Sequence, residues 1–425
     1  MEPGNIVRAL AALPRVQRAR SFVHETDAAT LAEMREIAAV ASPSFGERTR
    51  GRRVAESFRA LGFEGVKVDR VGNVIATYPD PDGHTIEETR YADRDFVGPP
   101  PGAVADGPVL VAAHLDTVFP EGTDLTVRQE NGRIMAPGIA DNARGLAAML
   151  AIARSLLKAG IRTARRLVFI ATVGEEGEGD LLGVKHLFRD GSPWRTASGF
   201  VALDGTGRNR IVHKALGSTR LRVTVTGPGG HSWADWGRAN PVHALGAAVA
   251  EIGKLRVPRW PRSSVTVARV SGGTTINAIP SSCWIELDIR SEGTATLAEL
   301  EAQARAVIGQ AVSRANSRRQ RGTPALQAQF DTIGQRPGGE TPAGAWIVRV
   351  AEATTELLGG SPERIAASTD ASAPIALGIP AITLGAGGES GGTHTVDEWY
   401  ANTGGPEGIE RALVTLLALT GVWNA

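Results

Sequence analysis

Short apolar segments that alternate with helical patterns constrain the fold of this chain more than any other feature. Three of these segments are residues 109–113, 166–173 and 200–203. Runs of this length and composition are typical of strands that are buried on both faces. A helical spacing of apolar residues lies between them at 143–158, and Gly160 marks its end. Alternating strands and helices predict an α/β fold with a mostly parallel sheet that helices cover on both sides.

The residues before this region predict two helices and a hairpin. The helices are expected at 30–40 and 47–61, and the two strands of the hairpin at 66–69 and 73–78. Residues 79–108 are polar, rich in proline and glycine and without periodicity. That leaves two interpretations of 79–108, a long surface loop or an insertion that carries little structure.

A different pattern interrupts the α/β region after Gly217. Apolar and polar residues now alternate, as they do in antiparallel strands with one solvated face. Strands and helices follow one another as β-α-β-β-α-β, which is the order of a complete ferredoxin-like module. Its strands are expected at 220–226, 264–271, 282–289 and 325–330, and its helices at 241–255 and 296–315.

The α/β pattern then resumes and runs to the end of the chain. A helix is expected at 344–358, a last strand at 381–384 and a closing helix at 407–419. The chain has 425 residues, which is too long for one ordinary core. We therefore expect a larger catalytic domain, made of 1–216 and 333–425, with the smaller domain 217–332 inserted into it.

Composition excludes several classes of protein. The net charge of +1 offers no electrostatic basis for binding nucleic acid or an anionic membrane. No apolar run approaches the roughly 18 residues needed to span a bilayer. Cys283 is the only cysteine, so neither an internal disulfide nor a cysteine-rich zinc site can form. The short apolar segment 5–13 has no small-residue cleavage site after it, so we expect a cytoplasmic protein without a signal peptide.

Five polar residues follow strands or lie in loops at the same predicted edge of the sheet. Ligand sites of doubly wound sheets form beyond the carboxyl ends of the strands. Two histidines and three carboxylates suit zinc, cobalt or manganese better than magnesium or calcium. One catalytic zinc uses about three protein ligands, whereas two metals that share a bridging carboxylate use all five. The candidate ligands are His114, Asp141, Glu176, Asp204 and His394.

Two further carboxylates stand next to these ligands. Asp116 is two residues from His114, so it can hold the other imidazole N–H and select the tautomer. Glu175 and Glu176 point apart because they are neighbours, so one can bind metal while the other acts as general base. Each motif also has an ordinary structural interpretation: Asp141, for example, could simply cap the helix that follows it. It is their joint occurrence at strand ends that favours a metallohydrolase.

The chain resembles the zinc-dependent exopeptidase and deacylase family that includes carboxypeptidase G, tripeptidase, aminoacylase-1 and succinyl-diaminopimelate desuccinylase. The resemblance extends from about residue 40 to the end of the chain. The sequence after the acidic pair, 178–183, is more similar to the carboxypeptidase G and tripeptidase branch. The matching segments are 114–118, 138–145, 174–177, 203–205, 227–232, 277–280, 288–290 and 394–398.

The resemblance implies a role for each of the candidate metal-site residues. His114 and Asp204 would hold one zinc, Glu176 and His394 the other, and Asp141 would bridge the two ions. Glu175 would be the general base, and Asp116 the partner of His114. The segment 369–371 resembles a family motif that we interpret as structural.

The resemblance also implies that the inserted domain is a lid that forms a homodimer. His231 would stabilise the oxyanion, often from the partner subunit, while Asn277 and Arg290 would hold the substrate's carboxylate. Arg290 also ends an amphipathic strand, so it could simply be solvated. Trp233 and Trp236 flank His231 and either line the pocket or pack inside the lid.

We therefore expect a two-zinc amidohydrolase that cleaves an amide bond next to a free carboxylate. Its substrates would be small peptides or N-acyl amino acids. A peptidase is favoured over a deacylase, and an N-carbamoyl amino-acid hydrolase remains a third alternative. A catalytically inactive binding protein is disfavoured because all five ligands and Glu175 are present. A single-metal dehydrogenase or isomerase on an α/β fold is disfavoured because no Gly-x-Gly-x-x-Gly follows the first parallel strand, which argues against a dinucleotide site.

Overall fold

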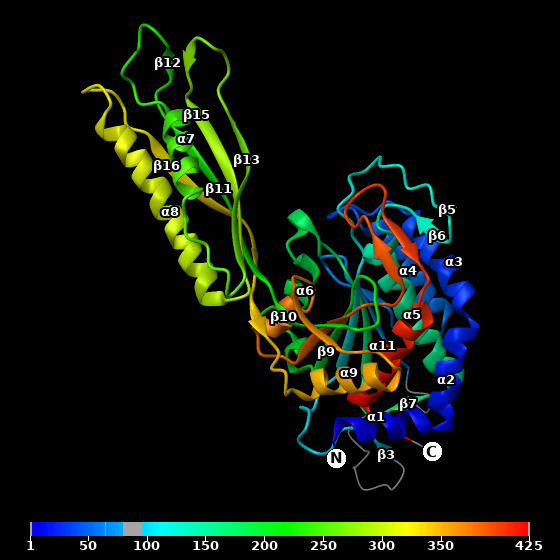
Figure 1. The fold of residues 1–425 in the computed structure, drawn as a ribbon. Coiled ribbons are helices and arrows are strands. Elements are labelled where there is room, and N and C mark those ends of the chain that lie inside the picture. The colour runs from blue at the N-terminus through cyan, green and yellow to red at the C-terminus, as the bar shows by residue number, and fades with distance from the viewer. Residues whose placement is uncertain (1, 64, 80–95, 424–425) are drawn as a thin grey trace. The chain divides into compact units, whose positions relative to one another are not determined.

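The computed structural model describes residues 2–63, 65–79 and 96–423, and its chain divides into two compact units. The larger unit consists of Met1–Ala215 and Glu340–Ala425, and the inserted unit of Leu216–Gly339 (Figure 1). No helix among the described residues is long and apolar enough to cross a membrane.

A mixed sheet of nine described strands forms the centre of the larger unit, with the order β1-β2-β8-β4-β9-β19-β10-β17, and β18 beside β10. The edge strand β17 is Gly339–Glu340. The pairs β8–β4, β4–β9 and β9–β19 are parallel, whereas β2–β8 and β19–β10 are antiparallel. The α/β fold is therefore confirmed, and the parallel strands lie in the middle of the sheet. Their bounds are Val109–His114 for β4, Leu167–Thr172 for β8, Gly199–Leu203 for β9 and Ala381–Leu384 for β19.

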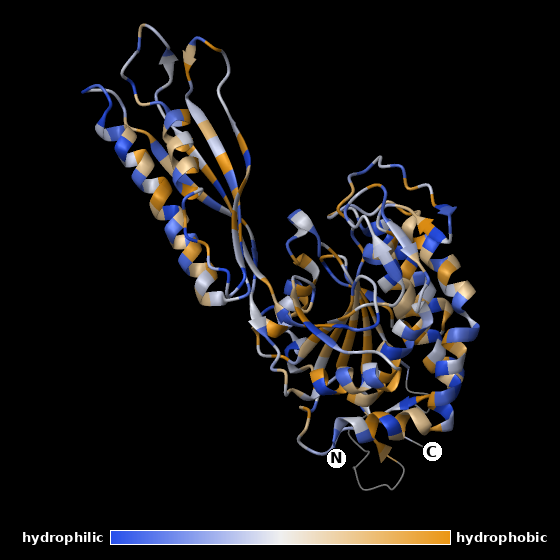
Figure 2. Cartoon of the chain, in the orientation of Figure 1, coloured by the Kyte–Doolittle hydropathy of each residue, from blue (hydrophilic) through white to orange (hydrophobic). Residues whose placement is uncertain are grey.

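The central strands are apolar throughout because both of their faces are covered. Val109, Val111 and Ala113 of β4 face one hydrophobic cluster, while Leu110 and Ala112 face another. Figure 2 shows these strands coloured as hydrophobic and the helices around them in both colours. The first cluster includes helices α5 (Arg144–Ala159), α9 (Trp346–Leu357) and α11 (Gly405–Thr420), and the second includes α6 (Leu182–Leu187) and α10 (Ser372–Ala376).

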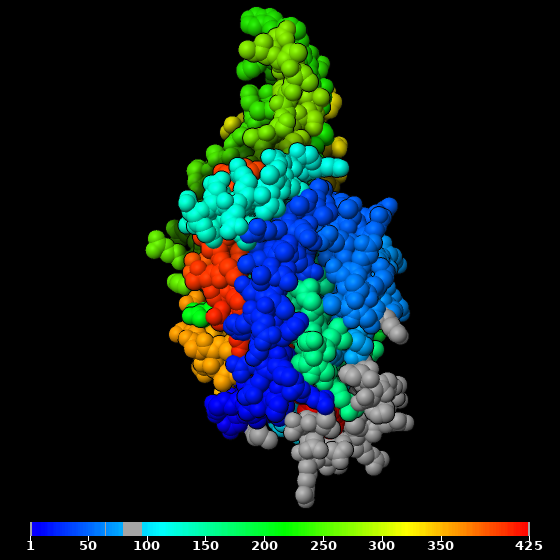
Figure 3. Space-filling model, turned by 90° about the vertical axis from the view of Figure 1, so that its right-hand side faces the viewer, coloured from blue at the N-terminus to red at the C-terminus, as the bar shows by residue number. Residues whose placement is uncertain are grey.

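The first three helices of the chain form an outer layer, and the sequence patterns predicted only the third of them. They are α1 (Pro3–Ala12), α2 (Pro14–Glu25) and α3 (Asp27–Ala38), which pack on α5, α9 and α11. Figure 3 shows them in blue on this face of the larger unit. A proline opens both α1 and α2, where its missing N–H costs nothing. The expected helix 30–40 thus starts three residues earlier, and the apolar segment 5–13 belongs mostly to α1.

The remaining elements of the larger unit are short. Helix α4 (Arg48–Ala60) and the hairpin of β1 (Lys67–Val68) and β2 (Val74–Thr77) match the expected elements. Of the polar stretch 79–108, residues 80–95 lie outside the described residues. The strands that the sequence patterns missed are β3 (Phe96–Val97), β5 (Arg128–Glu130), β6 (Arg133–Met135), β7 (Arg162–Thr163), β10 (Arg210–Ala215), β18 (Glu363–Ala367), β20 (Glu389–Gly391), β21 (Trp399–Ala401) and β22 (Val422–Trp423).

The inserted unit has the expected ferredoxin-like arrangement. Its four long strands are antiparallel in the order β13-β15-β11-β16, and α7 (Pro241–Ile252) and α8 (Thr294–Ser317) pack on them. Residue 332, the expected end of this domain, lies within β16 because that strand continues to pair with β11 as far as Arg336. The strands are β11 (Gly217–Thr226), β13 (Ser263–Gly272), β15 (Ser282–Ser291) and β16 (Gln327–Arg336).

Candidate metal centre

The five candidate ligands come from five separate segments of the larger unit. His114 ends β4, Glu176 follows β8 by four residues, and Asp204 follows β9 directly. Asp141 lies in the irregular turn before α5, and His394 lies in the loop between β20 and β21. Because parallel strands bring their carboxyl ends to one edge of the sheet, these segments meet there.

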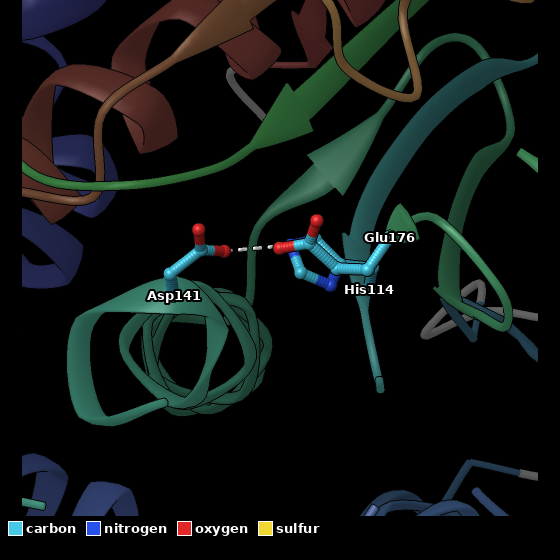
Figure 4. Close-up of side chains that lie close together, drawn as sticks. All are labelled: His114, Asp141 and Glu176. Atoms are coloured by element: carbon cyan, nitrogen blue, oxygen red, sulfur yellow. Dashed lines mark hydrogen bonds and ion pairs between the residues drawn. The ribbon is translucent and has the colours of Figure 1, made fainter. Parts of the chain in front are cut away.

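The ligand atoms form two groups that share Asp141. On one side, His114 Nε2 lies 3.0 Å from Asp141 Oδ1 and 3.8 Å from Asp204 Oδ1. On the other side, His394 Nε2 lies 3.2 Å from Asp141 Oδ2 and 3.0 Å from Glu176 Oε1. Figure 4 shows His114, Asp141 and Glu176 with their ligand atoms turned toward one another. Each of these three residues places one ligand atom within 4.8 Å of the other two.

This donor set fits two divalent ions. Each group contains one imidazole nitrogen and one carboxylate of its own, and each faces a different oxygen of Asp141. Nitrogen and carboxylate oxygen together are the donors of zinc, cobalt and manganese sites. The residues that would hold the ions are His114 and Asp204 for one and His394 and Glu176 for the other, with Asp141 common to both.

The electrostatics of the cluster show how strongly it attracts positive charge. Hydrogen bonds that His394 donates to the carboxylates of Asp141 and Glu176 raise the pKa of its imidazole to about 10. Burial opposes the charging of His114, but its contacts with Asp116, Asp141 and Asp204 outweigh burial and raise its pKa well above 6.5. Both shifts favour the protonated imidazoles, whose place divalent ions would take.

Asp116 holds the acidic pair rather than serving His114 alone. Its Oδ1 accepts the N–H of Glu175 (2.9 Å), and its Oδ2 accepts the N–H of Glu176 (3.0 Å) and the hydroxyl of Ser44 (2.7 Å). The nearest acceptor for His114 Nδ1 is the backbone carbonyl of Asp116 at 3.0 Å, while Oδ1 lies at 3.6 Å. The expected carboxylate–imidazole bond is thus mainly a carbonyl–imidazole bond, because the carboxylate turns toward the backbone that follows β8.

Glu398 is a positioning residue to which the sequence analysis assigned no role. Its side chain is fully buried, and its carboxylate accepts the backbone N–H groups of Gly138 (3.1 Å), Ala140 (2.8 Å) and Asp141 (2.9 Å). Burial is the main reason why the pKa of Glu398 rises to about 7. Glu398 therefore fixes the turn that carries the shared ligand. Glu398 follows the candidate ligand His394 by four residues, and this spacing indicates a position near the metal centre. The sequence alone does not show which backbone N–H groups its carboxylate accepts.

Two more buried carboxylates lie near the centre and were not recognised as part of it. Glu47 accepts the N–H of Gly174 (3.0 Å), at the start of the acidic segment. Asp370, from the segment interpreted as structural, accepts the hydroxyl of Thr172 (2.5 Å) at the end of β8. Burial raises the pKa of both carboxyl groups, that of Asp370 to about 6. Both residues support the strand end that leads to Glu175, which is itself buried.

In the inserted unit, two of the three expected substrate-contacting residues lie together. His231 of β12 (Gly230–His231) faces Ala278 of β14 (Ala278–Ile279), and the backbone carbonyl of Asn277 accepts the N–H of Ser232. Arg290 lies near the other end of β15, eight positions after Ser282. At about 3.3 Å per residue, this is a separation of about 26 Å along the strand.

The side chains around His231 are solvent-exposed, and that of Arg290 is partly exposed. Arg290 donates from Nε to Asp288 Oδ2 at 2.8 Å. The exposed fractions of Trp233 and Trp236 are 87% and 77%, so neither packs inside the inserted unit. Packing inside the lid, one of the two interpretations of these tryptophans, is therefore wrong.

Imidazoles and carboxylates that converge at the carboxyl edge of an α/β sheet define a metallohydrolase. The sequence profile of peptidase family M20/M25/M40 matches residues 110–419, and the protein belongs to this family. It is 28% identical over 287 residues to the putative succinyl-diaminopimelate desuccinylase DapE of Mycobacterium tuberculosis, covering 66% of this chain and 74% of that protein.

Solved structures of the family share the fold. The aminopeptidase PepT of Bacillus cereus superposes with a TM-score of 0.70 at 23% identity, covering 92% of this chain and 98% of that one. A dinuclear metal-binding peptidase of Bacillus subtilis superposes with a TM-score of 0.62 at 16% identity, covering 94% and 98%. The expected family, fold and hydrolase class are therefore confirmed.

Proposed function

We propose that the protein is a two-metal amidohydrolase that acts as an exopeptidase on small peptides or N-acyl amino acids with a free carboxylate. One observation carries the two-metal part of this proposal. Asp141 directs Oδ1 toward His114 and Oδ2 toward His394, which is the arrangement expected of a bridging ligand. Zinc suits the donors best, and cobalt or manganese would serve the same site.

The side chains of the larger unit suggest how the reaction proceeds. Divalent ions bound here would supply Lewis-acid chemistry that makes water nucleophilic near neutral pH. Glu175 would take the proton of that water and deliver it to the leaving amine. Its backbone is held by Asp116, so its carboxylate starts from a fixed position beside the ligand Glu176. A positioned base of this kind contributes on the order of 10²–10⁴ to the rate.

His231 has the geometry of an oxyanion donor. Its Nδ1 accepts the N–H groups of Trp233 (3.2 Å) and Ala234 (3.3 Å). In the neutral imidazole the proton therefore resides on Nε2, which can donate to a developing negative charge. The N–H of His231 bonds to Asp235 Oδ2 at 2.7 Å, which further fixes the residue.

We also propose that the active form is a homodimer built through the inserted unit. A dipeptide extends over about 7 Å, whereas about 26 Å of β15 separates Arg290 from Ser282, at the end of the strand near the segment of His231. We therefore do not expect His231 and Arg290 of one chain to reach the same substrate. Residues from two chains would meet that requirement. Edge strand β13 and the exposed side chains of Trp233, Trp236 and Ile276 offer a surface for the second copy.

The test of the dimer is complementation between inactive variants. His231→Ala and Arg290→Ala are each expected to lose activity, and mixing them should restore part of it if the two residues act from different chains. Sedimentation of the parent protein should give twice the mass of one chain. A monomer with full activity would remove the dimer from the proposal.

The test of the reaction is metal content together with turnover of a dipeptide panel. Protein purified without chelator should bind more than one zinc per chain and should hydrolyse dipeptides better than their amides. One metal per chain at full activity would contradict the two-metal mechanism. The cytoplasmic location stays a prediction.

An N-acyl amino-acid hydrolase is the second candidate. The similarity to a putative succinyl-diaminopimelate desuccinylase favours it, and an N-carbamoyl amino-acid hydrolase is a further alternative with the same metal centre. A substrate panel of dipeptides, N-acyl amino acids and N-carbamoyl amino acids separates the three activities.

A further inference from the structure

A pocket of about 420 Å³ lies between helix α4 and the turn of the β1–β2 hairpin in the larger unit. None of the described residues that line it is a candidate metal ligand, so the pocket is separate from the metal centre. Basic side chains dominate its wall. The charged residues of the wall are Arg48, Arg52 and Arg59 of α4, Arg70 of the hairpin turn, and the carboxylates Glu47 and Asp69.

The helical spacing of the arginines in α4 brings three of them to the same pocket. Arg48, Arg52 and Arg59 follow one another at intervals of four and seven residues, which places them on one face of the helix. At about 1.5 Å per residue, about 6 Å of helix separates Arg48 from Arg52 and about 10 Å separates Arg52 from Arg59. Two small residues of the same wall, Gly51 and Ala55, leave space between these side chains.

Both carboxylates of the wall are engaged with backbone groups. Asp69 Oδ1 accepts the three successive N–H groups of residues 71–73, each at 3.0 Å, so this carboxylate holds the hairpin turn. Glu47 Oε1 accepts the N–H groups of Phe45 at 2.9 Å and Gly174 at 3.0 Å. Within the described part of the chain, neither carboxylate forms an ion pair with an arginine of the pocket, so the excess of positive charge is not paired there.

The two other arginines of α4 do have partners. Arg50 is buried and donates to the backbone carbonyls of Val40 and Leu115, and Arg53 pairs with Glu36. The four arginines of the pocket are exposed, and among the residues that the structure describes we find no hydrogen bond or ion pair for any of them. Four cations around one small space attract an anion, and no neighbouring acid competes for them in the described ranges.

We propose that this pocket is a binding site for a small anionic ligand that carries at least two phosphate or carboxylate groups. A guanidinium offers a planar fork of donors that matches either group. The spacing of the arginines along α4 suits two charged groups joined by a few atoms, and the exposed side chains of Phe45 and Val68 would contact those atoms. The volume lies within the range of about 300–1,000 Å³ that is typical of small-molecule sites.

The pocket also borders the strand end that leads to the proposed general base. Val173 lines the pocket, and Glu47 of the same wall holds the N–H of Gly174, one residue before Glu175. A ligand that joins α4 to the hairpin turn would therefore steady this segment as well. We expect its binding to slow hydrogen exchange at residues 69–75 and 173–176.

The test is calorimetry of the zinc-loaded protein with fructose bisphosphate, fructose monophosphate and tricarballylate, which carries three carboxylates. The parent should bind the bisphosphate or the tricarboxylate more tightly than the monophosphate. Arg52→Met and Arg70→Met, from opposite walls, should each weaken that binding by about 10-fold or more, and Arg52→Lys should retain part of it. Arg18→Met is the matched control, because Arg18 is an exposed helical arginine of α2 outside the pocket wall.

The variants also separate this pocket from the metal centre. Phosphate that binds to the zinc ions would bind equally to the parent and to Arg52→Met, so only affinity that the variants lose belongs to the pocket. Tighter binding of fructose bisphosphate than of tricarballylate identifies a phosphorylated ligand, and the reverse order a polycarboxylate. The inference is overturned if the monophosphate binds as tightly as both polyanions, or if Arg52→Met and Arg70→Met bind them as tightly as Arg18→Met does.

Discussion

Replacement of Glu398 tests whether a buried carboxylate outside the ligand set holds the shared ligand in place. Oε1 of Glu398 accepts two N–H groups, those of Ala140 and Asp141, and Oε2 accepts the N–H of Gly138. Glutamine keeps one acceptor oxygen and replaces the other with a donor. Glu398→Gln therefore leaves two of these hydrogen bonds intact, whereas Glu398→Ala removes all three.

The magnitude follows from counting unpaired donors. A buried N–H without an acceptor costs about 1–3 kcal/mol. The glutamine variant thus destabilises the turn by about that amount. The alanine variant destabilises it by up to about three times as much, and water that enters the space left by the side chain reduces this cost by accepting some of the N–H groups. Asp141 belongs to both ligand groups, so in the variants metal can bind only if the turn returns to its native conformation. The free energy lost in the turn is therefore subtracted from the free energy of metal binding. At about 1.4 kcal/mol per tenfold, zinc affinity should fall by about 5- to 100-fold for glutamine and by more for alanine.

The assay is a competition titration of metal-free protein with a chromophoric chelator, together with hydrogen exchange at residues 138–145. Exchange should become faster in the same order as affinity falls. Asp397→Asn is the matched control, because it removes one charge from the neighbouring, exposed residue. Equal affinities for the glutamine and alanine variants, or a loss as large in the control, would refute the role of Glu398.

Three further predictions address the base, the ligands and the cysteine. Glu175→Gln should lose about 10²–10⁴-fold in turnover with its zinc content unchanged, whereas Glu176→Gln should lose metal; the opposite pattern by elemental analysis would reverse the two assignments. The carboxylates around His394 and His114 raise the pKa of His394 to about 10 and raise that of His114 above its ordinary value, so zinc binding should release protons and tighten as pH rises. Calorimetry in two buffers of different ionisation enthalpy measures this release, and its absence would contradict the electrostatic account. Burial raises the pKa of Cys283 to about 11, so a disulfide reagent at pH 8 should label the native protein far more slowly than the unfolded chain, and equal rates would show that the thiol is accessible.

The amino-acid sequence by itself determined the fold class and singled out the five candidate ligand residues that the fold brings to one edge of the sheet. Strands buried on both faces are apolar along their whole length, so β4, β8 and β9 are visible without any tertiary information. Parallel strands bring their carboxyl ends to one edge, so the polar residues that follow them must meet. Helices α1 and α2 were not predicted, because their buried faces become apparent only when α5, α9 and α11 are there to receive them.

Only the tertiary structure decided how the ligands are arranged and what supports them. Which oxygen of Asp141 faces His114 and which faces His394 depends on the turn that Glu398 holds from 257 residues further along the chain. Asp116 contacts the backbone of the acidic pair more closely than the imidazole to which its sequence spacing assigned it. Contacts of this kind join distant segments through backbone N–H and C=O groups. Almost every residue carries these groups, so the order of side chains along the chain does not predict which of them will be paired.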